Sequence, residues 1–515
     1  MKSLLPQQLN RTLLIFCGGA VLVLGSGLAC SIYIEHKIDE KIRSLNGSTA
    51  SIEVNLFTRS VRVKELAWCA SPYSLNTQPH ELKVSTLTVS GISIYKLVFN
   101  KILTANEVIF DNGKLQYNKS SIEHFQKFSN SKYRGFKIKN ISLVNIETQI
   151  KTDTLVSFSA LLNCHLTDAT LEIDSIDSIR YSVKAIDGLA EKINVSRQEG
   201  FYGGTIARLQ LNTSAQKLTI DSLLLIPNFT KYDFAHRFGK QTDRVSLSIP
   251  QLLIEGIQFD KIVDSSFVAS KMEIKSFDVV AFRDKRIPDR NETYVPLPME
   301  SLLALPCQIK VDSILITKSF ITIEEVSEKG TASGVVTFED VNATLTGLNN
   351  RITETDQDYA LLNASGYLMG AGKVTALFRL PLDGSSTYNA KGSLSKMPFK
   401  KLNAALVPLA NVQIESGQLN NLTFNFNYTD LTSKGTLDLA YQDLQLLALD
   451  KLDHSANDIK TFLLNALVNN HRAKSLSSTG KGVIDIERDR KRFIFNIWWK
   501  SIRDGLKSIL LASNN

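Results

Sequence analysis

The stretch Val84–Val98, VSTLTVSGISIYKLV, aligns without gaps with Ile249–Val263, IPQLLIEGIQFDKIV. Apolar residues recur at the same positions in both stretches, and a Gly-Ile pair follows them at Gly91 and at Gly256. Alternation of Val, Ile and Leu with polar residues is typical of a β-strand with one buried face. The match predicts that a β module occurs twice, which favours an architecture that extends by repetition.

Similar alternation recurs through most of residues 50–450 and is interrupted by turn sequences such as Asp111-Asn112-Gly113. Helical spacing of apolar residues is confined to short segments at residues 121–128, 399–409 and 458–468. Long helical patterns do not alternate regularly with the strands, so a parallel βαβ design is not expected. The sequence therefore predicts an all-β, antiparallel fold with a few peripheral helices.

Composition excludes several classes of protein. The chain has 515 residues, of which 43% are hydrophobic and 21% charged, and such a chain is not disordered. Twelve prolines are few for this length, which suits long sheets because proline cannot donate to an interior strand ladder. The net charge of +8 is mild and does not indicate a nucleic-acid partner. Five cysteines are too few for a disulfide scaffold.

The N-terminal region carries an apolar stretch without charge from Thr12 to Ile34, long enough to cross a hydrocarbon core of about 30 Å. We expect an uncleaved transmembrane signal anchor at residues 12–34 behind a short cytoplasmic head. Two alternatives stay open: a cleaved signal peptide, since Gly27–Cys30 resembles a lipoprotein cleavage site, and a buried helix of a soluble domain. The anchor residues are Leu13, Leu14, Ile15, Phe16, Val21, Leu22, Val23, Leu24, Leu28 and Ile32.

The C-terminal tail predicts a basic amphipathic helix within residues 486–515. Trp498, Ile502, Leu506, Ile509 and Leu510 share one helical face, and cations lie opposite, which is typical of a helix in an anionic lipid interface. The alternative is a helix that docks on the end of the sheet and covers its edge. The candidate interfacial residues are Arg488, Arg490, Lys491, Arg492, Trp498, Trp499, Lys500, Ile502, Arg503, Leu506 and Lys507.

The order of these features resembles the AsmA-like family of bacterial envelope proteins, which is related to the TamB-like and bridge-like lipid-transfer proteins. The resemblance covers most of residues 1–510. It rests on the apolar anchor, on Val89–Ile92 followed by Glu107–Gly113, and on Val412–Leu419 followed by Gly435–Leu444. It implies an elongated, twisted sheet folded into a groove that carries phospholipid acyl chains. It also implies a single-pass protein of the bacterial inner membrane, with its N-terminus in the cytoplasm and its bulk in the periplasm.

The expected function is therefore lipid handling that aids phospholipid transfer toward the outer membrane and supports envelope homeostasis. Membrane phospholipids are the expected partners, with outer-membrane assembly or lipid-transport proteins beside them. The apolar face of such a sheet must be covered, and a few short helices cannot cover it. The groove candidates are Val84, Leu87, Val89, Ile249, Leu252, Ile254, Leu422, Phe424 and Phe426. Closed β-sandwiches with dry cores are the structural alternative.

Two other functions stay open: an envelope assembly factor that receives strands of other proteins by β-augmentation, and a secreted hydrolase or lectin. No catalytic or metal-binding pattern supports an enzyme or a cofactor. The seven histidines are scattered, and adjacent Cys164 and His165 would point to opposite faces of a strand.

The expected organisation follows the chain. We expect a head at 1–11, the anchor at 12–34, a first β module at 50–175, a connecting β region at 176–248, a second β module at 249–347, a C-terminal AsmA-like β region with amphipathic helices at 348–485, and the tail helix at 486–515.

Overall fold

The computed structural model describes residues 28–69, 80–118, 134–152, 155–175, 178–196, 200–290, 292–353, 356–385, 387–449 and 478–511. The chain forms two compact units, unit 1 (Met1–Asp221) and unit 2 (Ser222–Asn515). The division falls inside the region expected to connect two modules, and not at either of its predicted ends.

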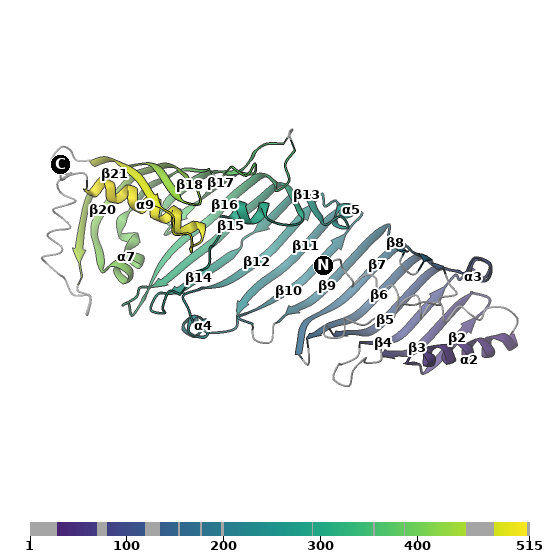
Figure 1. Cartoon of the computed structure of the whole chain (residues 1–515). Helices are drawn as coiled ribbons and strands as arrows, with labels where there is room; N and C mark the ends of the chain where they lie inside the picture. The colour runs from purple at the N-terminus through teal and green to yellow at the C-terminus, as the bar shows by residue number, and fades with distance from the viewer. Residues whose placement is uncertain are drawn as a thin grey trace. The chain divides into compact units, whose positions relative to one another are not determined.

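Unit 1 is a mixed sheet with two helices (Figure 1). Its elements are α2 (Leu28–Ser44), β1 (Gly47–Ser48), β2 (Ser51–Asn55), β3 (Ser60–Cys69), β4 (Glu81–Ser90), α3 (Ile94–Asn100), β5 (Ile102–Asn118), β6 (Gly135–Thr152), β7 (Leu155–Ser175), β8 (Ser178–Ser182), β9 (Ala185–Val195) and β10 (Tyr202–Asn212). β1 and β2 pair with β3, and β3 to β7 pair in chain order. β7 pairs with both β8 and β9, and β9 pairs with β10.

Unit 2 is also a mixed sheet, and β11 (Lys217–Pro227) crosses the division. Its elements are α4 (Lys231–Phe238), β12 (Asp243–Glu255), α5 (Phe259–Ile262), β13 (Ser266–Lys275), β14 (Asp278–Asp284), α6 (Pro298–Leu303), β15 (Gln308–Val326), β16 (Ser333–Asn349), β17 (Tyr359–Leu368), β18 (Gly372–Pro381), β19 (Tyr388–Pro398), η2 (Phe399–Leu402), α7 (Asn403–Ala410), β20 (Val412–Tyr428), β21 (Thr432–Ala448), β22 (Ser478–Glu487) and α9 (Ile494–Leu511). β13 and β14 both pair with β12 on one side and β15 on the other. From β15 to β22 each strand pairs with the next.

The expectation of a mostly β chain is confirmed, but the expectation of a purely antiparallel sheet is wrong. β5 and β6 are parallel, and so are β13 and β14 with β15. A parallel pair needs a crossover of a dozen or more residues. Residues 119–134 lie between β5 and β6, and residues 285–307, which include α6, lie between β14 and β15.

The helix expected at 399–409 is present as η2 and α7, and the tail contains α9. The helices expected at 121–128 and 458–468 lie outside the described residues.

A row of left-handed residues crosses three strands of unit 1. Glu65 in β3, Asn112 in β5 and Asn145 in β6 have φ of 52°, 50° and 51°. The strand registers place them in one row, with Ser85 of β4 between the first two. The backbone N–H of Asn145 donates to Oδ1 of Asn163 in β7 at 2.9 Å, where the β6–β7 register shifts. Such bulges bend a strand and increase its twist.

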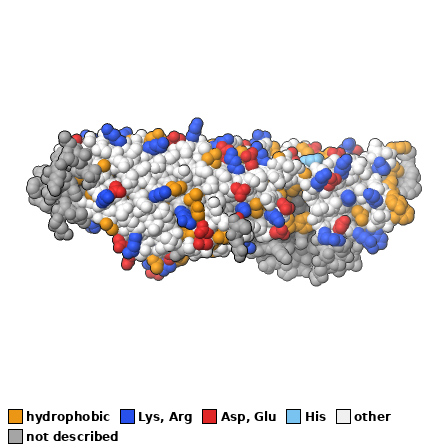
Figure 2. Space-filling view, turned by 90° about the horizontal axis from the view of Figure 1, so that it is seen from above, with side chains coloured by type: hydrophobic (Ala, Val, Ile, Leu, Met, Phe, Trp, Pro, Cys, Tyr) orange, Lys and Arg blue, Asp and Glu red, His pale blue; other side chains and the backbone are white. Residues whose placement is uncertain are grey.

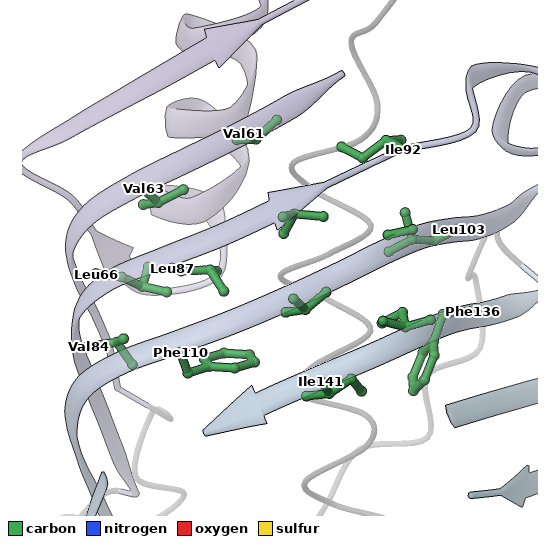
Figure 3. Close-up of a cluster of buried hydrophobic side chains, with 14 of the residues drawn as sticks. Val61, Val63, Leu66, Val84, Leu87, Ile92, Leu103, Phe110, Phe136 and Ile141 are labelled. Carbon is green, nitrogen blue, oxygen red and sulfur yellow. The ribbon is translucent and has the colours of Figure 1, made fainter. Parts of the chain in front are cut away.

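This row changes which side chains face the core. Val63 precedes Glu65 and Leu66 follows it, yet both are buried in the same core cluster. On β4, Val84 precedes Ser85 of the row and Leu87 follows it, and both are buried in that cluster as well. Figure 3 shows these side chains converging from neighbouring strands. The apolar face of the sheet therefore stays continuous across the bend, although the simple two-residue alternation does not.

Unit 2 repeats this local geometry in the segment that aligns with unit 1. Matched pairs of left-handed residues are Gly91 (67°) and Gly256 (69°), Lys101 (58°) and Ser265 (57°), Asn112 (50°) and Ser276 (55°), and Asn145 (51°) and Lys318 (49°). The backbone N–H of Lys318 donates to Oδ1 of Asn342 at 3.0 Å, as Asn145 does to Asn163. Each segment has a strand, a short helix, a second strand and then a parallel strand.

Helix α2 closes one end of the apolar face of unit 1. Ile34, Ile38 and Ile42 recur every fourth residue, form one stripe and are buried in the core with β3 to β6. Burying each side chain contributes about 1.5–3 kcal/mol. Ile34 was expected to end the membrane anchor, but the structure places it inside unit 1.

The anchor residues Leu13–Leu24 lie outside the described residues, whereas Ile32 lies in α2 and is exposed. Among the helices that the structure does describe, none is both long and apolar enough to span a bilayer.

Candidate apolar binding surface

The apolar face of unit 1 continues beyond its closed core onto β7, β9 and β10. Ile146 of β6 is buried and pairs with Leu162, which pairs with Ala190, which pairs with Leu209. Directly paired residues lie on one face of a sheet. Leu162, Ala190 and Leu209 are only half-buried. Coverage of this face therefore decreases from β6 towards β10.

Unit 2 has an equivalent row across β13 to β17. Met272 pairs with Ile314, Ile314 with Leu345, and Leu345 with Leu362. All four side chains are half-buried. The row continues from Leu362 to Phe378 of β18, which is buried in the core beneath α9. Each unit thus has an apolar face that helices cover in part, α2 and α3 in unit 1 and α6, η2 and α9 in unit 2, while the side chains of the row stay only partly buried at the margin of the core.

Most of the groove candidates chosen from sequence lie in closed cores. Six are less than 9% exposed: Val84, Leu87, Val89, Ile254, Leu422 and Phe426. Ile249, Leu252 and Phe424 are half-buried. Val84, Leu87 and Val89 share a core with the stripe of α2, and Leu422 and Phe426 share one with α9. In this structure these five side chains are buried in the cores of the two units.

Sequence reasoning missed the half-exposed rows. Leu162, Leu345 and Leu362 have the same alternation as the core strands, so their local pattern carries no sign of weaker cover. The missing information was which strands the helices cover, and this depends on tertiary packing.

The tail helix docks on its own sheet. Ile497 and Ser501 of α9 are buried, and Ser501 Oγ donates to Ser433 Oγ of β21 at 2.7 Å. A Cβ on Gly482 would lie 2.1 Å from the carbonyl oxygen of Gly505, so the glycines permit close approach of β22 and α9. Trp498 stacks on Phe378 with ring centroids 4.4 Å apart. The helix face expected in lipid, which includes Trp498, Ile502 and Leu506, instead packs on the core of unit 2.

The basic residues of the tail divide into two groups. Arg488 and Arg490 both pair with Asp430, and Arg492 pairs with Asp289. Those three guanidinium groups therefore hold the start of the tail to unit 2. Lys491, Arg503, Lys507 and Trp499 are exposed, and Lys500 is half-buried.

A hollow beside α9 has a volume of about 570 Å³ and is lined by Ile486, Glu487, Lys500, Arg503, Asp504 and Lys507. A second hollow, of about 550 Å³, includes Asn363, Leu377, Lys391 and Asn425. These four residues pair across β17 to β20 on the face opposite the apolar row. Neither hollow is lined by the half-exposed rows.

The described part of the chain contains no cluster of side chains that could bind a metal ion. No three His, Cys, Asp or Glu residues there lie close enough to hold a metal ion. Cys164 lies half-buried on the apolar face of β7, where burial raises the pKa of its thiol to about 11. His165 is exposed, and its Nδ1 lies 3.1 Å from Ser142 Oγ. Cys164 is thus a weak nucleophile at neutral pH.

Comparison of the sequence with protein-family models and with curated proteins found no match.

Proposed function

We propose that the protein handles lipid, and that phospholipid acyl chains lie against the half-exposed apolar rows of its two units. In this proposal it is anchored in the bacterial inner membrane, lies mainly in the periplasm and aids phospholipid transfer toward the outer membrane. The observation that carries the proposal is the row Met272–Ile314–Leu345–Leu362, with its counterpart Leu162–Ala190–Leu209.

The energetics favour an apolar ligand. The side chains of the rows are partly buried, and Leu162, Ile314, Leu345 and Leu362 also pack against the cores of their units. The apolar surface that they leave in water costs about 25 cal/mol per Å², which a hydrocarbon ligand would recover. The rows consist of aliphatic, Met and Ala side chains, which offer no hydrogen bonds. Hydrocarbon chains fit such a surface, whereas sugars, nucleotides and ions do not.

The bulge rows support the groove that the resemblance to AsmA-like proteins implies. Left-handed residues in register at Glu65, Asn112 and Asn145, and at Ser276 and Lys318, bend neighbouring strands at the same level. A sheet bent in this way curls around one of its faces. We propose that each sheet curls around its apolar face, so that acyl chains lie inside and headgroups at the rim.

β-Augmentation by a partner strand fits the half-exposed rows less well. Strands β7, β9, β15, β16 and β17, which carry most of these rows, each pair with neighbouring strands on both sides. A strand added from another protein needs a free edge. The apolar rows offer side chains for contact, and no free backbone N–H or C=O groups with which a partner strand could pair.

The test compares adjacent positions on opposite faces of β17. We expect the full chain, purified in mild detergent, to carry phospholipid that solvent extraction and native mass spectrometry detect. Leu362→Asp places a carboxylate in the apolar row and should remove most of the bound phospholipid. Asn363→Asp adds the same charge on the exposed opposite face and should retain it.

Circular dichroism shows whether both variants keep the wild-type β content. A wild-type chain without phospholipid would refute the proposal. If both variants fold and retain equal amounts of phospholipid, the row that contains Leu362 does not bind the acyl chains.

A further inference from the structure

We infer that one end of unit 1 is a bilayer-contact surface that lies at the headgroup level of an anionic membrane. We call it the contact end and define it by the start of α2 with Ile32 and Tyr33, the turn with Phe57, and α3 with Tyr95, Val98 and Phe99. The inference rests on the proposed membrane anchoring but not on the carriage of lipid.

Three hydrogen bonds place these segments together. Asp39 of α2 accepts a bond from Thr49 Oγ1 at 3.0 Å, and Glu35, one turn earlier, accepts one from the N–H of Val54 at 3.1 Å. The start of α2 therefore lies towards the end of β2 and the turn that follows it. In that turn the carbonyl of Arg59 accepts a bond from Ile92 N–H at 3.2 Å, directly before α3.

The contact end exposes large apolar side chains. Phe57 is 92% exposed, Phe99 72% and Ile32 72%, and the rings of Tyr95 and Phe99 lie 5.0 Å apart. Leu97 is buried and Ile94 packs against the same core, so these two residues hold α3 to the sheet, whereas Tyr95, Val98 and Phe99 are exposed. In Figure 2 hydrophobic side chains gather at the right-hand end, where α2 and α3 lie in Figure 1.

The aligned helix of unit 2 shows that the fold does not require these aromatic residues. Lys96, Leu97 and Val98 match Lys261, Ile262 and Val263, but the positions of Tyr95 and Phe99 hold Asp260 and Asp264. The sequence therefore places aromatic rings in α3, and carboxylates in α5 and just after it. This difference points to a contact that α3 makes and α5 does not.

The surrounding charge fits anionic headgroups. Arg59 lies in the turn, Lys96 in α3 and Lys101 at its end, and Arg134 bonds through its backbone to Lys101 at 2.8 Å. All four side chains are exposed. Neither the turn, residues 56–59, nor α3 contains an acidic residue. Aromatic residues next to Lys and Arg are typical of surfaces at the membrane interface.

The sequence that precedes α2 indicates that the contact end meets a lipid bilayer. Residues 12–27 carry no charge and are mostly apolar, and they lead directly into α2, whose start belongs to the contact end. If that stretch enters a bilayer, the contact end lies next to the same bilayer. A partner protein would not explain why the apolar stretch and the exposed aromatic residues meet at one place.

The experiment uses matched positions in the two units. Val98→Cys and Val263→Cys are each introduced into a full chain whose five native cysteines are replaced, and each is labelled with an environment-sensitive fluorophore. The labelled chains are reconstituted into vesicles of phosphatidylglycerol and phosphatidylethanolamine that contain lipids with a quencher near the headgroup. We expect blue-shifted emission and strong quenching at position 98, and neither at position 263.

A second variant tests the aromatic residues. Tyr95→Asp with Phe99→Asp gives α3 the acidic residues found at the matching positions of unit 2, Asp260 and Asp264, and should abolish quenching at position 98 without unfolding unit 1. An unquenched label at position 98 in the wild type would overturn the inference, as would a blue shift that grows with protein concentration in detergent without vesicles. If the protein still carries bound phospholipid in either case, the proposed lipid handling stands, and only the proposed bilayer contact is refuted.

Discussion

Arg488, just after β22, forms a buried ion pair with Asp430 in the turn between β20 and β21. The Arg488 side chain is 1% exposed, and its Nη2 also donates to the carbonyl oxygen of Val295 at 2.6 Å. Arg490 approaches the other carboxylate oxygen of Asp430 at 2.7 Å. The pair therefore connects the segment before α9 to two parts of unit 2 that are distant in sequence.

Loss of Arg488 should destabilise unit 2. Arg488→Met removes the buried partner of Asp430 and the donor to the Val295 carbonyl, while Arg490 and Tyr294 still bind the Asp430 carboxylate. We therefore expect a cost of about 1–3 kcal/mol. Urea unfolding followed by tryptophan fluorescence measures this change, because Trp498 and Trp499 lie in α9. Lys507→Met, at an exposed position of the same helix, should change the free energy of unfolding by less than about 0.5 kcal/mol. Equal effects would show that the buried pair does not hold the tail.

Gly256, a left-handed glycine of the second module, should not tolerate a side chain. Gly256 has φ +69°, and a Cβ there would lie 2.3 Å from Ser270 Oγ. We expect Gly256→Ala to cost about 2–3 kcal/mol, from backbone strain and from displacement of Ser270. Gly239 has φ +78° with nothing within 4 Å of such a Cβ, so Gly239→Ala should cost only about 1 kcal/mol. Chemical denaturation of the two variants compares them, and a similar loss in both would mean that Ser270 yields without cost.

The duplicated geometry explains how far the sequence could predict this fold. Gly91 and Gly256 aligned in the sequence, and both have left-handed backbones at matching places. Asn112 belongs to the sequence Asp111-Asn112-Gly113, which predicted a turn, but this sequence lies inside β5 and Asn112 is a left-handed residue within the strand. Asn145 and Lys318 are left-handed as well but differ in residue type, so no shared residue pattern marked them. Their conformation is set by the register with the neighbouring strand, which becomes defined only when the sheet forms.

The candidate surface was only partly predictable for a similar reason. An apolar sheet face larger than its helical cover could be inferred from the strand pattern. Whether Leu87 or Leu362 lies under a helix could not, because both have the same alternation. The ion pairs of the tail were also hidden, since Arg488 finds Asp430 and Val295 only after distant segments have packed together.

Burial of His80 should make unit 1 sensitive to acid. His80 is 8% exposed, it stacks on Tyr117 with ring centroids 4.6 Å apart, and burial lowers the pKa of its imidazole. The unfolded chain takes up a proton near pH 6.5, while the folded chain resists it until lower pH. Stability that is present above pH 6.5 should therefore be lost as the pH falls below it, at up to about 1.4 kcal/mol per pH unit.

The variant His80→Phe tests this pH dependence. It keeps a ring for Tyr117 and removes the titrating group, so its stability should fall less between pH 7 and pH 5. Thermal unfolding followed by circular dichroism across this range measures the difference, and His165→Phe at the exposed surface controls for loss of an imidazole. If His80→Phe loses as much stability as the wild type between pH 7 and pH 5, groups other than His80 cause the loss.

Cys164 should report whether lipid covers the apolar face. Its pKa of about 11 leaves roughly one thiol in a thousand ionised at pH 8, so maleimide labelling should be slow and rise about tenfold per pH unit. The experiment uses a variant in which Cys164 is the only cysteine. Cys164 pairs with Leu143 and Gly188 on the apolar face, so phospholipid added to the delipidated protein should cover the thiol and slow its labelling further. His165→Cys in a Cys164→Ser background places the thiol on the opposite, exposed face of β7, where lipid should not change the rate. If lipid slows both thiols alike, or neither, acyl chains do not lie on this face of unit 1.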